Sequence, residues 1–128
     1  MKIAMTGVYV NDPLEAFKHY TETLGFLKKI FVPEAMLAVV VSPEAPDGPA
    51  LLLEPSDHPI SKAYQQGLYA AGIPIIVMGT QTLEDDYARL SAKGVIFRKP
   101  PTKTDWGMEA VFEDNCGNLI SLSQISQG

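Results

Sequence analysis

The sequence has little of the material from which several classes of protein are built. Its single cysteine, Cys116, excludes a disulfide within the chain and a zinc site made of several cysteines. Its 10 Lys and Arg residues are outnumbered by 15 Asp and Glu residues, and the net charge of -5 gives no attraction to nucleic acid or anionic lipid. No apolar run approaches the roughly 18 residues of a membrane span, and residues 1–7 lack the features of a signal peptide. We therefore expect a cytoplasmic protein that binds neither nucleic acid nor membrane.

The chain does contain enough apolar sequence for one folded domain. It has 128 residues, of which 46% are hydrophobic and 20% are charged. A disordered chain would have far fewer apolar residues for this amount of charge. This length and composition are typical of a single globular domain.

The first half of the chain predicts one strand, one helix and three more strands. Asp12 and Pro13 form a helix start, because Asp can cap free amide groups and Pro needs no donor at the first helical position. Apolar residues then recur at spacings of three and four until Gly25 ends the helix. The expected strands are 3–10, 26–32, 36–41 and 50–54.

The same order of signals returns about seventy residues later. Thr82 starts a second helix, and Gly94 ends it. The expected strands here are 73–78, 95–98, 108–112 and 119–122, and a linker over about 56–72 carries a helix at 61–71. The sequence therefore predicts an α+β fold in which a single domain, 1–128, is built from paired βαβββ modules over about 1–55 and 73–128.

Two stretches of sequence resemble the signatures of a known superfamily. Residues 10–20 with 24–26, and residues 90–95 followed by 112–120, are similar to the first helix and the closing hairpin of the vicinal oxygen chelate superfamily. That superfamily contains glyoxalases, bleomycin-resistance proteins and extradiol dioxygenases. The resemblance implies that each module curls its sheet into a half-barrel and that the inward faces surround a ligand cavity.

The resemblance also implies where a metal ion would be held. Metal-dependent members carry His on the first strand of each module and Glu on the last strand, and these places hold Met5, Ile75 and Ser121 here. The remaining position falls, depending on strand register, on Leu51, Leu53 or Glu54. A thioether is soft, an isoleucine has no donor and a serine is a poor donor at neutral pH. We therefore expect no metal cofactor, with Glu54 as a weak candidate ligand.

Other polar and aromatic residues have a structural and a functional interpretation. We expect His19 to serve helix packing, His58 to lie in a solvated loop or cap a helix, and Cys116 to fill a tight turn. Trp106 either stacks on a planar ligand or closes one end of a half-barrel. Strand alternation puts Glu109 either in the cavity or on the opposite, solvated side, and we favour the second position.

The favoured hypothesis is a protein that binds a small organic ligand in its cavity without the usual metal site. Its candidate cavity residues are Met5, Glu54, Ile75, Trp106, Glu109 and Ser121. Two alternatives stay open: a metal-dependent lyase, isomerase or dioxygenase with an altered ligand set, and a regulatory or protein-interaction module. The sequence assigns no catalytic residue. We also expect a homodimer, as the resemblance implies, because a half-barrel leaves strand edges that need covering.

Overall fold

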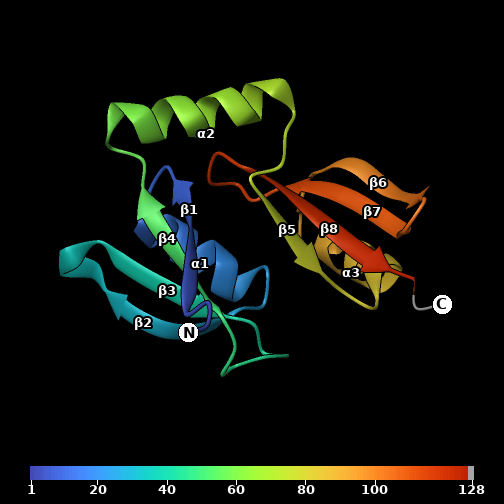
Figure 1. The fold of residues 1–128 in the computed structure, drawn as a ribbon, viewed down its shortest axis with the longest axis horizontal. Helices are drawn as coiled ribbons and strands as arrows, with labels where there is room; N and C mark the ends of the chain where they lie inside the picture. Colours follow the sequence, from blue (N-terminus) through green and yellow to red (C-terminus); the bar gives the residue numbers. More distant parts are fainter. Residues whose placement is uncertain (127–128) are drawn as a thin grey trace. The chain divides into compact units, whose positions relative to one another are not determined.

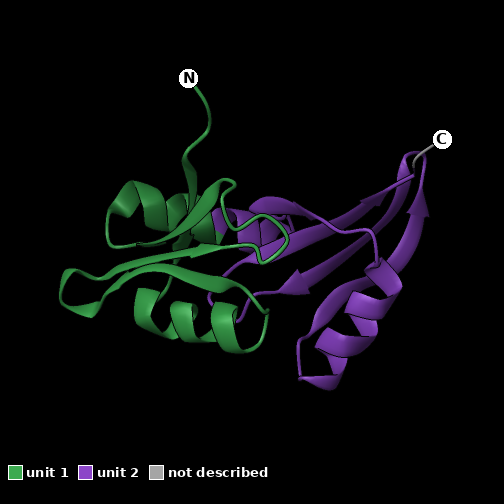
Figure 2. Cartoon of the chain, turned by 90° about the horizontal axis from the view of Figure 1, so that it is seen from below, with its two compact units in different colours: residues 1–66 green, residues 67–128 purple. Residues whose placement is uncertain are grey.

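The computed structural model describes residues 1–126 and divides the chain into two compact units, Met1–Gln66 and Gly67–Gly128 (Figure 2). The boundary between the units falls inside α2 (Pro59–Ala71), so this helix supplies residues to both units (Figure 1). Gln127 and Gly128, which end the expected second module, lie outside the described residues. The organisation of the chain as one domain of two modules stays a prediction.

The first unit is a mixed sheet of four strands with one helix packed against it (Figure 2). Its elements are β1 (Met5–Val10), α1 (Pro13–Glu22), β2 (Leu27–Val32), the short 3-10 helix η1 (Pro33–Ala35), β3 (Leu37–Val41) and β4 (Ala50–Pro55). The strand order is β1-β4-β3-β2, in which β1 runs parallel to β4 and the other pairs are antiparallel.

The second unit repeats this topology. Its elements are β5 (Ile76–Gly79), α3 (Leu83–Ala92), β6 (Phe97–Thr104), β7 (Gly107–Glu113) and β8 (Leu119–Ile125). The strand order is β5-β8-β7-β6, and the single parallel pair again joins the first and last strands of the unit. The predicted α+β fold of two βαβββ modules is therefore confirmed, and within residues 1–126 neither sheet closes into a barrel.

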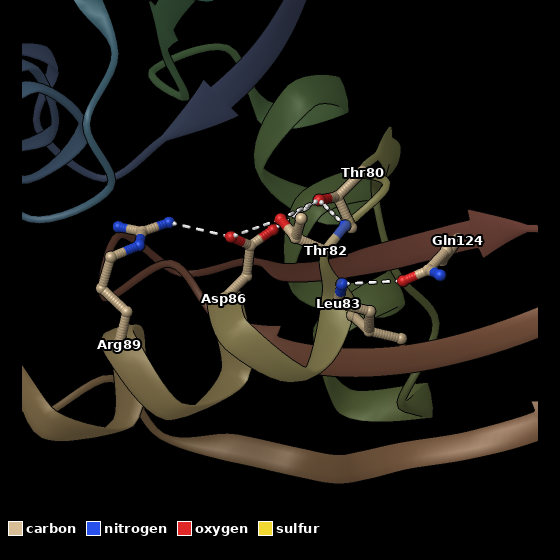
Figure 3. Close-up of polar contacts among 6 residues, drawn as sticks. All are labelled: Thr80, Thr82, Leu83, Asp86, Arg89 and Gln124. Carbon is tan, nitrogen blue, oxygen red and sulfur yellow. Dashed lines mark hydrogen bonds and ion pairs between the residues drawn. The ribbon is translucent and has the colours of Figure 1, made fainter.

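The two corresponding helices begin in different ways. Asp12 caps α1 as predicted, because its Oδ1 accepts the backbone N–H groups of Leu14 at 2.9 Å and Glu15 at 3.4 Å. Thr82 stands at the same place before α3, but its side chain makes no such cap. The acceptor comes instead from β8, where Gln124 Oε1 receives the N–H of Leu83 at 2.8 Å (Figure 3). The start of α3 therefore depends on a residue 41 positions away in the sequence.

Each helix buries an apolar face against its own sheet. In the first unit the ring of Phe17 on α1 stacks on Phe31 of β2, with the ring centroids 4.0 Å apart. In the second unit Tyr87 on α3 meets Phe97 of β6 at 4.6 Å. The buried residues on these helix-covered sides include Val8, Val10, Leu53, Leu83, Phe112 and Ile120. These contacts identify which side of each sheet is covered by its own helix.

α2 is the longest helix of residues 1–126, with 13 residues, and begins two residues earlier than the predicted start at Ser61. His58 lies at its N-terminus, where the ring Nδ1 accepts the backbone N–H of Ile60 at 3.1 Å, so of the two roles expected for it, a solvated loop residue or a cap, it has that of a cap. The first half of α2 is tied to the first unit by Gln65, whose Nε2 donates to Asn11 Oδ1 at 3.2 Å. Among the helices described, none has the length and apolar character needed to cross a membrane.

The predicted end of the strand over 95–98 is wrong. β6 continues through Pro100 and Pro101 to Thr104. β6 is an edge strand with register shifts between Lys99 and Thr102, and an edge strand tolerates Pro because it has fewer ladder hydrogen bonds to supply. Residues 99–103 therefore belong to a strand.

Candidate functional site

The pairing of β1 with β4 decides which side of the first sheet Glu54 occupies. Tyr9 pairs with Glu54 and Gly7 with Leu52, whereas Val8 pairs with Leu53. Paired residues on neighbouring strands point to the same face. Since Val8 and Leu53 lie on the side that α1 covers, Glu54 lies on the other side. We call this side, which α1 does not cover, the first open face.

The inner strands give the first open face an apolar floor. They contribute Leu37, Val39 and Val41 from β3 and Ala50, Leu52 and Glu54 from β4. Val39 is only 1% exposed and forms a buried cluster with Val41 and Ala50, against which Leu37 and Leu52 pack. A concave site for an organic ligand needs such an apolar surface with a few polar groups.

The edge strands extend the same face with side chains that are still exposed. They contribute Met5, Gly7 and Tyr9 from β1 and Leu27, Ile30 and Val32 from β2. Four of these are large hydrophobic residues that remain accessible: Met5, Leu27, Ile30 and Val32. Exposed apolar side chains gathered on one face of a sheet mark a binding surface more often than scattered ones do.

Glu54 alone carries a charge among the described residues that the register assigns to the first open face. Its side chain lies over Gly7, because a Cβ atom at position 7 would come within 2.5 Å of Glu54 Oε2. Within residues 1–126 the carboxylate of Glu54 has no hydrogen bond and no ion pair. The face therefore combines a large apolar surface with one carboxylate.

The face of the second sheet that α3 does not cover, the second open face, is more polar. The residues that the register assigns to it include Val77, Lys99, Thr102, Glu109, Val111, Glu113, Leu119, Ser121 and Ser123. Glu109 pairs with Ser123, so the odd-numbered residues of β7 take this face, and whether Glu109 lines a ligand cavity stays a prediction. The carboxylate of Glu109 lies 4.0 Å from the Lys99 ammonium.

The positions at which the resemblance places metal ligands are divided between the two units. Met5 and Glu54 share the first open face, and Ser121 lies on the second, where it pairs with Val77. Ile75 directly precedes β5 and donates its N–H to the carbonyl of Leu119. Only Glu54 offers an anionic donor, and residues 1–126 gather no group of three or more His, Cys, Asp and Glu side chains suited to a metal ion. The residues present do not fit the usual metal.

The remaining candidates lie outside the strands, one in a turn and one in a helix. Trp106 occupies the turn between β6 and β7 and is 79% exposed. His19 is a half-buried residue of α1 whose ring lies 6.4 Å from that of Tyr20, in agreement with the predicted packing role. A contribution of Trp106 to ligand binding stays a prediction.

Cys116 is buried in the hairpin between β7 and β8, as its interpretation as a turn residue predicted. Asp114 organises this hairpin: its Oδ1 accepts the N–H groups of Cys116 at 2.8 Å and Asn118 at 3.0 Å. The Asp114 carboxylate also accepts the side-chain amide of Asn118 at 2.9 Å. The resemblance of this segment to a family signature therefore reflects the construction of a turn.

A polar cluster of three residues, Tyr69, Arg98 and Glu113, was missed by the sequence analysis. The Tyr69 hydroxyl donates to Glu113 Oε1, and the guanidinium of Arg98 donates to Tyr69 at 2.9 Å and lies 3.3 Å from Glu113 Oε2. The hydrogen bond from Tyr69, with the smaller contribution of Arg98, holds the pKa of Glu113 below its usual value near 4.5. The cluster ties the end of α2 to β6 and β7, and no local sequence signal links these three positions.

A second polar cluster surrounds the start of α3 (Figure 3). Asp86 accepts the hydroxyl of Thr80 at 2.5 Å and that of Thr82 at 3.3 Å, and forms an ion pair with Arg89 at 3.4 Å. Each side chain of this cluster has its partner within the turn or the helix. The cluster therefore stabilises the beginning of α3. The Asp86 carboxylate serves this local structure, and we do not count it as a ligand-binding group.

The comparison with known proteins agrees with this architecture. A model of the Glyoxalase/Bleomycin resistance protein/Dioxygenase superfamily matches residues 2–122. The chain belongs to this superfamily. A curated relative, the uncharacterized protein YurT of Bacillus subtilis (strain 168), is 44% identical over 126 residues, which cover 97% of this chain and 99% of YurT.

Two solved structures place this superfamily member among its structural relatives. The crystal structure of UcmS2 superposes with a TM-score of 0.80 at 26% identity and covers 95% of this chain and 96% of UcmS2. TnmS3, described as an antibiotic binding protein from Streptomyces sp. CB03234, superposes with a TM-score of 0.75 at 27% identity. That match covers 98% of this chain and 97% of TnmS3.

Proposed function

We propose that this superfamily member binds a small organic ligand with an apolar body, and that the first open face is the surface that receives it. The observation that carries the proposal is the apolar floor around Val39, bordered by large side chains such as Ile30 that remain exposed. Transfer of such surface from water to a ligand contributes about 25 cal/mol per Å². A ligand that covers this face therefore gains affinity from burial alone.

We propose further that binding needs no metal ion. The three positions Met5, Ile75 and Ser121 supply no donor set for a divalent ion, and Glu54 by itself would hold one weakly. The likeness to TnmS3, described as an antibiotic binding protein, supports sequestration of a small molecule over chemistry at a metal. Fold alone does not decide function, so the proposal rests on the face and its donor chemistry.

The test is a titration of EDTA-treated protein with a panel of small aromatic compounds, in which isothermal titration calorimetry measures binding. Two variants on β2 provide a matched pair: Ile30→Ser alters the first open face, whereas Lys28→Ser alters the opposite side of the same strand. We expect Ile30→Ser to weaken binding about tenfold, and Lys28→Ser to change it by less than twofold. Equal effects of the two variants would place the ligand elsewhere.

The proposal includes a homodimer and a cytoplasmic location. Each of the two sheets has two edge strands, β1 and β2 in the first and β5 and β6 in the second, and exposed edges favour pairing with another chain. Light scattering coupled to size-exclusion chromatography checks the dimer, and a monomer at micromolar concentration would contradict it. Cell fractionation with an antibody against the native protein checks the location.

A further inference from the structure

We infer that Glu54 is an anchor for a positively charged group, so that the ligand is an amphiphilic cation: a protonated amine or quaternary ammonium attached to a flat apolar body. The inference rests on the proposed function and specifies its ligand class. It begins from charge, because Glu54 alone carries a charge among the residues that the strand register assigns to the first open face. A ligand complementary to that face is apolar with one positive group.

The other carboxylates that we have placed near a sheet face have cationic partners inside their own unit. Glu109 lies 4.0 Å from Lys99, and Glu113 lies 3.3 Å from Arg98. Glu54 is also partly buried, yet within the described chain it has neither an ion pair nor a hydrogen bond. A partly desolvated carboxylate is stabilised when a cation reaches it. The contrast points to a partner that comes from outside the protein.

Gly7 gives this carboxylate its position. The two strands are parallel and in register, so Glu54 stands beside Tyr9, and its side chain lies back over Gly7. A side chain at position 7 would occupy the space of Oε2, since a Cβ there would lie only 2.5 Å from that atom. The carboxylate therefore rests along the apolar face, where a ligand lying on that face can reach it.

An aromatic residue pairs with Glu54 in the strand register, and a second aromatic ring packs against it. Tyr9 is the register neighbour of Glu54 on β1, and Tyr64 of α2 meets the ring of Tyr9 edge to face, with centroids 6.3 Å apart. Tyr64 is 50% exposed, so part of its ring is open to a ligand. Aromatic faces attract ammonium groups within about 6 Å, and carboxylate and aromatic rings together form the usual recognition set for such groups.

The test compares two probes of equal size that differ in charge. Naphthalen-1-ylmethylamine is a cation at pH 7, and naphthalen-1-ylmethanol is its neutral counterpart. We expect the native protein to bind the amine about tenfold more tightly than the alcohol at 50 mM salt, because a hydrogen bond to a charged group is stronger than a neutral one. In Glu54→Gln the ratio of the two affinities falls to near one. Addition of 500 mM NaCl lowers the ratio in the native protein.

Two further variants control for charge and for position. Glu22→Gln removes the same charge from the exposed end of α1 and should keep the tenfold ratio. Gly7→Ala keeps the carboxylate but displaces it, and should lower the ratio several-fold while the melting temperature stays within a few degrees of the native value.

The outcomes separate this inference from the proposed function. If the alcohol binds the native protein as tightly as the amine, the inference is overturned and the proposed function stands. If Glu54→Gln and Glu22→Gln lower the ratio equally, the effect is one of net charge, and the anchor role of Glu54 is overturned. If neither probe binds at millimolar concentration, the inference falls, and the panel of aromatic compounds decides the proposed function separately.

Discussion

The carboxylate of Glu54 occupies the space above Gly7 that a side chain at position 7 would fill. This relationship joins the edge strand β1 to the inner strand β4, and it places over the apolar surface the one charged group that the strand register assigns to the first open face. Gly7 and Gly107 make close approaches of different kinds, one to a side chain and one to the backbone, and the difference can be measured.

Gly7→Ala should leave the free energy of unfolding unchanged within about 0.5 kcal/mol, because the atom that it meets is the flexible end of a side chain. Gly107→Ala should lower it by about 2 kcal/mol or more. Gly107 has φ of 154°, and a Cβ there would lie 2.0 Å from the backbone oxygen of Gln124, which cannot move aside alone. Urea unfolding of both variants checks the contrast, and equal losses would contradict the claim that the side chain of Glu54 moves aside at low cost.

The cluster of Tyr69, Arg98 and Glu113 should make stability depend on acid pH. The pKa of Glu113 is lowered in the folded chain, so its contribution is fully present above the unfolded value near 4.5 and is lost as pH falls through the lowered value. We expect the free energy of unfolding of the native protein to be about 1 kcal/mol higher than that of Glu113→Gln at pH 6. The difference should vanish in strong acid. Urea unfolding between pH 2.5 and 6 measures this.

Tyr69→Phe serves as the control for that pH dependence. It removes the hydroxyl that donates to Glu113 Oε1, which is the largest cause of the lowered pKa, and leaves the aromatic ring beside Arg98. The acid-dependent part of the stability should therefore shrink in this variant. A pH profile identical to that of the native protein would show that the hydroxyl of Tyr69 does not determine the ionisation of Glu113.

The start of α3 should be sensitive to a residue on β8. Gln124→Ala leaves the N–H of Leu83 without its acceptor, and we expect a loss of about 1 kcal/mol together with faster hydrogen exchange of that amide. Gln124→Glu keeps an acceptor at the same place and should lose less. The exposed neighbour Gln81 provides the matched change, because Gln81→Ala should have almost no effect. Equal losses in the two alanine variants would argue against the cap from Gln124.

The order of elements could be predicted from the sequence because its signals are local. Asp12 and Pro13 predict the start of α1, and the matching signals at Thr82 and Gly94 predict the limits of α3. The repeat therefore follows from residues close together in the chain. The strand pairing around Leu51–Glu54 could not be predicted, because a continuous apolar run has no alternation and a slip of one residue reverses both faces. Once the pairing is known, Glu54 can be placed.

Other parts of the candidate site depend on contacts between distant residues. Tyr69, Arg98 and Glu113 come together only in the folded second unit, and Pro100 belongs to a strand because that strand lies at an edge. The sequence did hold one unused signal: a glycine inside a strand, Gly7, indicates a close approach by another group. The role of Met5, Ile75, Trp106, Glu109 and Ser121 in ligand binding stays a prediction.

The central claim is that ligand binding needs no metal, and one measurement tests it most directly. Untagged protein is treated with EDTA, its metal content is determined, and the dissociation constant of a bound aromatic ligand is measured before and after addition of Mn, Fe, Co, Ni or Zn. A metal that binds the native state would raise the melting temperature by mass action. We predict much less than one equivalent of bound metal and no shift in melting temperature on addition of metal. We also predict that the dissociation constant of the ligand changes by less than twofold. Near-stoichiometric metal, with ligand binding or turnover that requires it, would contradict the account.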